Sequence, residues 1–439
     1  MDPQMSSLRT GNNMATAATG GHMMAPDDPD SPMNWPLYRR LYTSMAAFAF
    51  AFSTTFGATA YTVGLKGVAT EFGVEPHVAV LGFSVYLFGI FFAPIYTPHI
   101  SERVGRTPVY FVGTFLSALF IIGAGWTQSF ASLIVTRFFA GFFAGPNVVL
   151  IEGTFADIWA ARTTNTYYAF LGFAQYFGAA CGPLILGFIV PVTSWRWTQY
   201  ITLMIQAAVL LFAIGVPETY QREIIRRRAR RAGLPHGLAP AASGTTLIEM
   251  ARHTLINPII MLYSEPIVIG ITLYLGLCFG IVFQWFITVP AVLNMVYDYT
   301  LQQIGLAFIS AIIGSVMAAL TSILIEQIVV RILARRNANL TIENRLIPAM
   351  IGGFFILASL FWVGNTAAPT FNSLVPITGT GVYVYGNLLV IISLIPYIFD
   401  AYLPQGTLSA LTAMACFRLA MAGVVPLVIL QFFMNATGK

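Results

Sequence analysis

The chain has 439 residues, of which 57% are hydrophobic and only 9% are charged, and its formal net charge is +5. This small number of polar side chains could not cover the surface of one or two water-soluble domains. The chain is therefore expected to lie in a lipid bilayer. Apolar runs of about 20 residues, the length that a helix needs to cross a bilayer, recur along it, whereas a membrane β-barrel would show short alternating segments. The composition therefore indicates an all-α, polytopic membrane protein.

The first segment, residues 1–36, is polar and rich in Gly, Ser, Asp and Pro, which predicts a disordered cytosolic tail rather than a cleaved signal peptide. Eleven apolar runs follow, and each predicts one membrane-spanning helix. In chain order these spans are residues 41–65, 77–100, 108–127, 130–153, 164–190, 198–216, 267–293, 301–330, 346–364, 374–399 and 402–433.

The longest connection, residues 217–266, divides these spans into six and five. Such a division is typical of membrane proteins built from two repeated halves. The sequence therefore predicts an amino-terminal six-helix bundle over residues 37–216, a basic cytosolic loop over residues 217–266 and a carboxyl-terminal five-helix bundle over residues 267–439.

The distribution of positive charge predicts the orientation in the membrane. With the amino terminus in the cytosol, seventeen of the 22 Lys and Arg residues lie on the cytosolic side and three on the outer side, and Arg137 and Arg418 lie within spans. The carboxyl terminus is then expected outside, and the plasma membrane is the expected location. The run from Arg226 to Arg231 in the central loop is expected to anchor this topology at the lipid headgroups, with a specific partner site as the alternative.

A charged loop follows the second predicted span and contains Glu102, Gly105 and Arg106. Gly105 allows a tight turn between antiparallel helices. Glu102 and Arg106 can pair with each other or with neighbouring helix ends, and such a pair would latch one conformation at the cytosolic side. An ordinary charged hairpin loop is the alternative interpretation.

Arg137 lies within the fourth predicted span. An ionised side chain in an apolar helix is costly unless it faces a partner or a wet cavity, so Arg137 is a candidate functional residue, with snorkelling toward the outer surface as the alternative. All seventeen acidic residues are expected in loops or at span ends. Among them Glu152, about four turns along the same helix from Arg137, is the nearest candidate for a coupling role.

The fifth predicted span contains Gly178, Gly182, Pro183 and Gly187. Pro183 removes a backbone hydrogen bond and the glycines let a neighbouring helix approach, so this helix is expected to kink at the point where a seal forms. A purely structural kink is the alternative.

Together these motifs resemble the fungal twelve-span drug:proton antiporter family of the major facilitator superfamily, including its branch of mycotoxin, fungicide and polyamine exporters. The charged loop resembles the family's loop signature, Arg137 its proton-transfer arginine and Gly182-Pro183 its antiporter signature. The resemblance implies two pseudo-symmetric helical bundles, here with the last span missing. It also implies proton-coupled efflux of a hydrophobic or aromatic small molecule, driven by a proton gradient without a cofactor.

The same resemblance implies a central cavity between the bundles. The polar residues that would be available to line it are Asn147, Gln175, Tyr176, Gln284, Asn387 and Arg418. A few fixed polar groups in an apolar pocket suit bulky aromatic solutes. The alternative for each amide is an interhelical hydrogen bond.

The sequence contains no phosphate loop, zinc-type His spacing or nucleophile elbow, so the predicted protein is not an enzyme and holds no metal. The expected partners are the lipid bilayer, a small-molecule substrate and protons, without nucleic acid, and the expected state is a monomer. Two alternatives to export stay open. Because only eleven spans are found, the chain could be a truncated, non-transporting sensor or scaffold, and an importer of the same superfamily is the second alternative.

Overall fold

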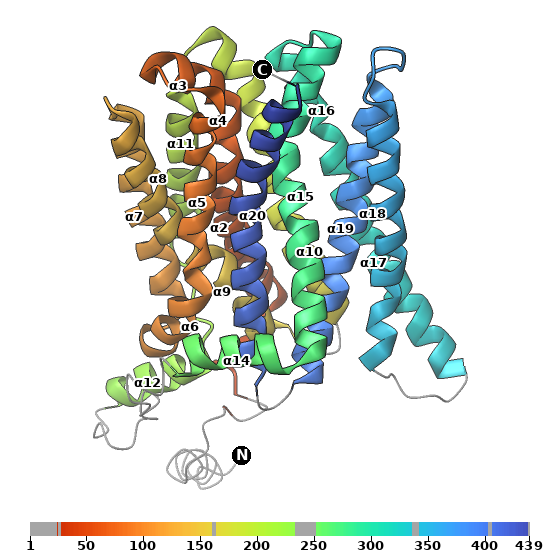
Figure 1. The fold of residues 1–439 in the computed structure, drawn as a ribbon. Coiled ribbons are helices and arrows are strands. Elements are labelled where there is room, and N and C mark those ends of the chain that lie inside the picture. Colours follow the sequence, from red (N-terminus) through yellow and green to blue (C-terminus); the bar gives the residue numbers. More distant parts are fainter. Residues whose placement is uncertain are drawn as a thin grey trace, which may run out of the picture.

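The computed structural model describes residues 24, 28–159, 164–232, 252–335, 342–402 and 406–437. Every regular element within these ranges is a helix, and the long helices run side by side from one end of the molecule to the other (Figure 1). The first ten α-helices are α2 (Leu37–Ala60), α3 (Leu65–Phe72), α4 (Pro76–Ala79), α5 (Leu81–Phe91), α6 (Ala93–Val104), α7 (Arg106–Trp126), α8 (Phe130–Ala144), α9 (Pro146–Ile158), α10 (Thr164–Ile189) and α11 (Trp197–Phe212).

The remaining α-helices begin in the predicted central loop. They are α12 (Gln221–Arg231), α14 (Asn257–Ser264), α15 (Pro266–Tyr297), α16 (Leu301–Ala307), α17 (Ile309–Arg335), α18 (Ile347–Thr366), α19 (Leu374–Ala401) and α20 (Thr407–Thr437). The end at which α2 begins also holds α12 and is called the basic end below (bottom of Figure 1); the opposite end is the far end.

Most of the predicted membrane spans meet a test of length and hydropathy. Among the described residues, eight helices or continuous helix pairs pass this test, and the bent pair Pro76–Phe91 and Ala93–Val104, with an angle of 42°, makes a ninth. The other two predicted spans correspond to α11, which has only 16 residues, and to α2, whose Ser and Thr residues lower its hydropathy. A multi-pass, all-helical membrane protein is confirmed.

Glycine allows the helices to approach one another closely. A Cβ atom on Gly89 of α5 would lie 2.3 Å from the carbonyl oxygen of Phe138 in α8, and one on Gly141 of α8 would lie 2.1 Å from the carbonyl oxygen of Tyr86 in α5. Van der Waals contact between backbones replaces the hydrophobic driving force that is absent in lipid. These small residues therefore determine which helices become neighbours.

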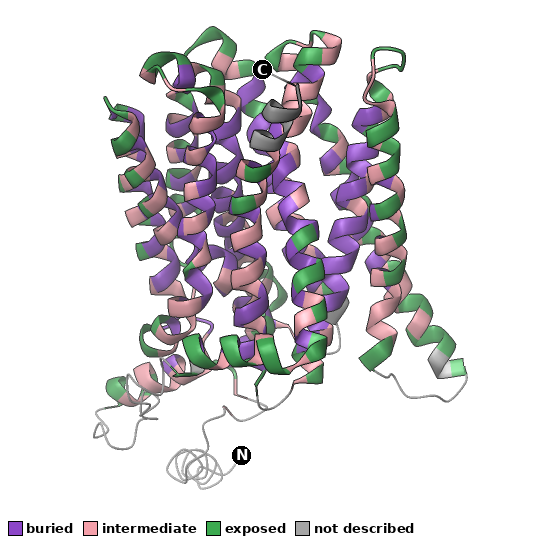
Figure 2. Ribbon diagram, in the orientation of Figure 1, coloured by how far each residue is buried: buried purple, intermediate pink, exposed green. Residues whose placement is uncertain are grey.

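The helices form two groups that meet along two seams. In the first group α2, α5, α7, α8, α9 and α11 pack on one another, and in the second α15 packs on α20 while α19 packs on α17 and α18. Helix α10 packs on α2 and also on α16, α17 and α19, and α20 packs on α5. Figure 2 shows buried residues on the faces that the helices turn to one another and exposed residues on the outer faces. The domain boundaries given above stay predictions.

Part of the predicted disordered tail is ordered. Residues 28–35 form a strap at the basic end, with a short 3-10 helix at Pro32–Asn34 that contacts α9. Trp35 is only 4% exposed, and Arg228 of α12 pairs with Asp28 at 2.8 Å. Residues 1–23 and 25–27 of the tail, residues 233–251 of the central loop and the last two residues of the chain lie outside the described residues.

Candidate functional site

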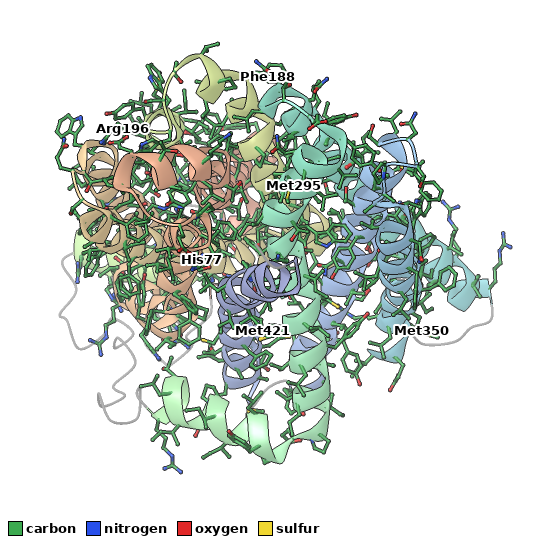
Figure 3. The ribbon with its side chains drawn as sticks, turned by 45° about the horizontal axis from the view of Figure 1, so that its top comes forward. His77, Phe188, Arg196, Met295, Met350 and Met421 are labelled. Atoms are coloured by element: carbon green, nitrogen blue, oxygen red, sulfur yellow. The ribbon has the colours of Figure 1, made fainter. Side chains whose placement is uncertain are left out.

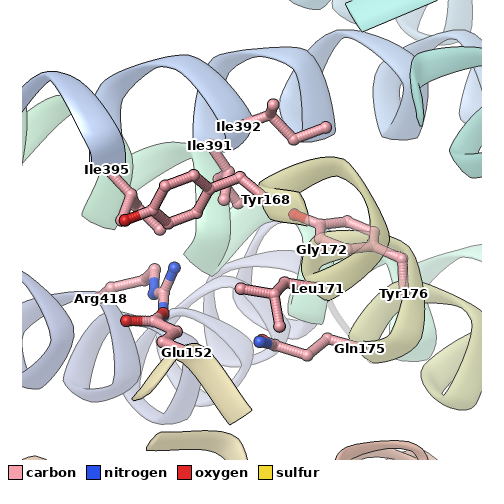
Figure 4. Close-up of a pocket in the computed structure, with 10 residues that line it drawn as sticks. All are labelled: Glu152, Tyr168, Leu171, Gly172, Gln175, Tyr176, Ile391, Ile392, Ile395 and Arg418. Atoms are coloured by element: carbon pink, nitrogen blue, oxygen red, sulfur yellow. The ribbon is translucent and has the colours of Figure 1, made fainter. Parts of the chain in front are cut away.

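A small cavity lies between the two groups of helices (Figure 4). Four helices contribute to it: α9, α10, α19 and α20. Its lining residues are Glu152, Tyr168, Leu171, Gly172, Gln175, Tyr176, Ile391, Ile392, Ile395 and Arg418. The walls are thus aliphatic and aromatic, and one carboxylate, one guanidinium, one amide and two phenol groups interrupt them.

The two charged groups of the cavity come from opposite groups of helices. The carboxylate of Glu152, from α9, and the guanidinium of Arg418, from α20, point toward one another in Figure 4. Arg418 is 5% exposed and lies over the ring of Phe279 at 4.9 Å. Within the described residues its Nε has no hydrogen-bond partner. Glu152 is therefore the acidic side chain that faces this buried cation.

Glu152 lies near one end of its span. The helix pair α8 and α9 covers Phe130–Ile158 as one apolar unit, so Glu152 lies between one and two turns inside its end. The predicted span ended at residue 153, and the helix therefore continues about one turn further than predicted. The expectation that acidic residues lie in loops or at span ends stays a prediction.

A second contact between the two groups, beside the cavity, joins Tyr176 of α10 and Asn387 of α19. The phenol donates a hydrogen bond to Oδ1 of Asn387. Asn387 is 1% exposed, and its Nδ2 has no partner among the described residues. The cavity wall thus includes Tyr176, with Asn387 directly behind it.

Three residues predicted for the cavity do not line it: Asn387, described above, and Asn147 and Gln284. Asn147 is fully buried inside the first group, where its Nδ2 donates to Oγ1 of Thr54 at 3.1 Å and to Oγ1 of Thr114 at 3.0 Å. It ties α9 to α2 and α7, which is the interhelical alternative stated above. Gln284 donates to Oγ1 of Thr288 on its own helix, at 2.6 Å.

Arg137 is fully buried, so the snorkelling alternative is wrong. Its Nε and Nη1 donate to the carbonyl oxygens of Gly82 at 3.1 Å and Gly57 at 3.0 Å, and a third donor reaches Ala58 at 3.4 Å. The rings of Tyr61 and Tyr86 lie 4.7 and 4.4 Å from its guanidinium carbon, so cation–π attraction adds to the hydrogen bonds. Arg137 therefore binds α8 to α2 and α5.

The charged loop forms a cluster at the basic end. Arg106 pairs with Asp157 of α9 at 3.0 Å, and its backbone N–H donates to Glu218 at 2.8 Å. Gly105 has φ +93°, and a Cβ there would lie 2.3 Å from Oε2 of Glu218, so only glycine fits this turn. Within the described residues no ion pair joins Glu102 to Arg106, so of the two partners considered for Arg106, the neighbouring helix end is the one found.

The glycines of α10 contact helices of both groups. A Cβ on Gly178 would lie 2.5 Å from the carbonyl oxygen of Phe52 in α2, and one on Gly187 would lie 2.7 Å from that of Leu301 in α16. Gly182 lies against Thr59 of α2 in the same way. α10 continues as one helix through Pro183. The role in transport that was predicted for this motif, a seal at a kink of the helix, stays a prediction.

Sequence reasoning missed several residues of the site. Asp157, the partner of Arg106, could have been found as a carboxylate at the end of an apolar run. The isoleucines of α19 in the cavity, Ile391, Ile392 and Ile395, carry no such signal, because isoleucine is equally common on faces that meet lipid.

A bundle of membrane-spanning helices with a charged cavity between two groups is the architecture of a secondary transporter. The family model of the Major Facilitator Superfamily matches residues 45–425. The chain belongs to this superfamily and is a transporter, not an enzyme.

Curated relatives come from fungi. Transporter mfs1 of Schizosaccharomyces pombe is 29% identical over 420 residues, which are 93% of this chain and 79% of that protein. Efflux pump FUBT of Fusarium oxysporum is 28% identical over 86% of this chain, which spans only 65% of that protein. The citrinin biosynthesis cluster MFS transporter mrr1 of Monascus ruber is 28% identical over 92% of this chain and 82% of its own length. These relatives support the fungal exporter family.

Solved structures share the fold. The proton:xylose symporter XylE bound to 6-bromo-6-deoxy-D-glucose has a TM-score of 0.61 at 14% identity and covers 92% of this chain and 90% of its own. The human organic anion transporter MFSD10 (TETRAN) has a TM-score of 0.60 at 18% identity over 92% and 95% of the two chains.

Proposed function

We propose that this protein is a proton-coupled exporter of hydrophobic or aromatic small molecules. Relatives with the printed names efflux pump and citrinin cluster transporter support export, and the apolar cavity walls suit such solutes. No cofactor besides the proton gradient is proposed. The protein acts as a monomer in the plasma membrane, with the basic end in the cytosol.

The observation that carries the proposal is the opposition of Glu152 and Arg418 across the cavity. An ionised Glu152 attracts Arg418 and holds α9 against α20, since charges attract strongly where water is scarce. A proton that binds Glu152 removes this attraction, so the two groups can separate and open the cavity. When Glu152 releases the proton on the opposite side of the membrane, the attraction to Arg418 returns. Proton movement is thereby coupled to the change between the conformations that open the cavity to one side and to the other.

The other predicted residues act around this pair. Arg137 moves α2, α5 and α8 as one unit, because it is hydrogen-bonded to the backbones of the first two. The cluster of Gly105, Arg106 and Asp157 closes the basic end, with Glu102 in the last turn of α6 beside it. In the cavity, Gln175 and Tyr176 give the solute polar contacts.

The proposal is tested by measuring how much of each compound in a panel of aromatic toxins, polyamines and sugars accumulates in a drug-sensitive host that expresses the protein. Expression of the protein should lower accumulation of an aromatic toxin, and a protonophore should abolish the difference. Glu152→Gln should abolish it as well, whereas Glu75→Gln, the same change at a side chain that is 71% exposed, should not. Higher accumulation on expression would establish import instead. Unchanged accumulation of every compound would leave a non-transporting scaffold.

A further inference from the structure

The segment Arg252–Ser264 lies outside the bundle of long helices. It begins as a single π-helical stretch, Arg252–Ile256, and continues as α14. In Figure 1, α14 lies crosswise to the long helices at the basic end, directly before α15 begins. This position is the level at which the ends of membrane spans meet the lipid headgroups.

The outer face of this segment is apolar. Its exposed large side chains are Leu255, Ile256, Ile259, Ile260 and Tyr263, which are 46%, 51%, 56%, 53% and 82% exposed. They recur every three or four residues and so form one stripe along the helix. The opposite face carries the buried Thr254 and Pro258 and packs on α20. A water-soluble helix has the reverse arrangement, with its apolar stripe turned to the protein.

The apolar stripe continues the exposed apolar surface of a membrane span. On α15, which follows at once, Ile267, Leu273 and Leu277 are about half exposed and belong to a membrane span. Arg252, at the start of the segment, is exposed as well. An apolar edge with a cation beside it matches the boundary between acyl chains and anionic headgroups.

We propose that Arg252–Ser264 is an interfacial helix that binds the anionic lipid surface of the leaflet at the basic end. Its stripe inserts into the boundary between headgroups and acyl chains, Tyr263 lies at headgroup level, and Arg252 pairs with lipid phosphates. This inference does not rest on export or on proton coupling.

The proposed lipid contact reaches both groups of helices. Thr254 is hydrogen-bonded to His99 of α6 in the first group, and α14 packs on α20 in the second. The segment therefore bridges the seam between the groups at the basic end. A bilayer that holds this segment also limits how far α6 and α20 can separate there.

Depth-dependent fluorescence quenching tests the proposal on the full chain. The three cysteines, Cys181, Cys278 and Cys416, are replaced by alanine, and Ile259→Cys carries an environment-sensitive dye in nanodiscs of phosphatidylcholine with phosphatidylserine. Met33→Cys, an exposed apolar position on the strap at the same end, is the matched control. The dye at residue 259 should be blue-shifted and quenched several-fold more strongly by lipids with a nitroxide near the headgroup than the dye at residue 33. Tyr263→Cys, on the same stripe, should repeat the result if the first variant folds poorly.

Two outcomes overturn the proposal. A dye at residue 259 that emits and is quenched as at residue 33 shows that the stripe faces water. A blue-shifted dye that nitroxide lipids do not quench shows that protein, from this chain or a second copy, covers the stripe. A second comparison tests the charge: phosphatidylserine should increase quenching in the wild-type background and not in Arg252→Gln. An equal increase in both removes Arg252 from the lipid contact.

Discussion

The two groups of helices differ in how their outer faces are covered. In the first group α11 packs on both α2 and α7, and the glycines of those helices meet its side chains: a Cβ on Gly57 would lie 2.9 Å from Thr202, and one on Gly125 would lie 2.7 Å from Tyr200. In the second group a Cβ on Gly270 of α15 or Gly364 of α18 would meet nothing within 4 Å. Other glycines of the second group do meet a neighbour, as Gly352 of α18 does, with its Cβ position 2.5 Å from the carbonyl oxygen of Gly386 in α19. Gly270 and Gly364 thus mark particular open faces of α15 and α18.

Burial is low in two spans of the second group. The span of α18 is only 22% buried and that of α16 and α17 33%, whereas α7 and the pair α8 and α9 are 50% and 56% buried. In the second group α15 and α20 are 50% buried and α19 is 78% buried, so the uncovered face belongs to α17 and α18. Met350 of α18, labelled in Figure 3, is 76% exposed. Lipid solvates such side chains without a hydrophobic cost, so an uncovered helix persists in a membrane but loses packing contacts. Helix neighbours, rather than hydropathy, are therefore expected to determine how firmly each helix is held.

The largest expected effect comes from a glycine in the covered group. Gly141→Ala places a methyl group 2.1 Å from the carbonyl oxygen of Tyr86, so α5 and α8 must separate and the cost should be about 3 kcal/mol or more. Gly270→Ala, on the open face, should instead raise helix stability by about 0.5–1 kcal/mol. Thermal unfolding of both variants in nanodiscs measures the contrast. Equal losses of stability would show that the face of α15 at Gly270 is covered as well.

The two buried arginines sharpen the comparison. Arg137 has three carbonyl acceptors, so Arg137→Lys should cost about 2 kcal/mol of stability, because an ammonium cannot reach them all. Arg418 has no partner for its Nε within the described residues, so Arg418→Lys should cost less stability. If Arg418 is the partner of Glu152 in coupling, its lysine variant should still lower proton-dependent efflux. Unfolding temperature and efflux rate are measured on the same preparations, and a larger loss of stability in Arg418→Lys would contradict this expectation.

Local opening should also differ between the groups. Amides of α18 should exchange hydrogen faster than those of α5 and α8, because fewer packed side chains must separate before α18 opens. Hydrogen exchange followed by mass spectrometry in nanodiscs measures this. Exchange at the same rate in α18 and α8 would be evidence that lipid holds an uncovered helix as firmly as protein does.

The smallest expected effect concerns the strap on the first group. Both Nη atoms of Arg228 donate to the carboxylate of Asp28, and these hydrogen bonds hold the pKa of Asp28 below its ordinary value of 3.8. A lowered pKa means that the pair stabilises the strap fully above pH 3.8 and less as the pH falls through the lowered pKa. Because Arg228 is 48% exposed, the contribution should be only about 0.5 kcal/mol. Proteolysis of the strap should rise at acidic pH in the wild type. The Arg228→Gln variant, which lacks the pair, should be cleaved equally at each pH above 3. If the wild type is cleaved as easily as this variant at pH 7, the pair contributes nothing to the stability of the strap.

The sequence predicted the fold and part of the site. Charged residues in apolar runs are rare and costly, so Arg137, Glu152 and Arg418 stood out, and the structure buries the first and places the other two in one cavity. The amides could not be assigned in the same way. Helices in lipid are apolar on both faces, so periodicity does not show which face turns inward, and Asn147 and Gln284 were placed in a cavity that they do not line.

Contacts between distant segments were equally hidden. Arg106 and Asp157 are 51 residues apart in the chain, and no local pattern joins them. The strap was expected to be disordered because its composition is polar, yet the burial of Trp35 and the pairing of Asp28 with Arg228 order it.

The acceptors of Arg137 are all main-chain oxygen atoms, those of Gly57, Ala58 and Gly82. A point mutation changes a side chain but leaves the peptide carbonyl in place, so no single substitution at these three positions can delete an acceptor. The cavity wall has no such protection where side chains such as those of Ile391, Ile392 and Ile395 line it. A substitution can therefore reshape the cavity wall directly, whereas at these three positions it reaches the acceptors of Arg137 only by moving the backbone.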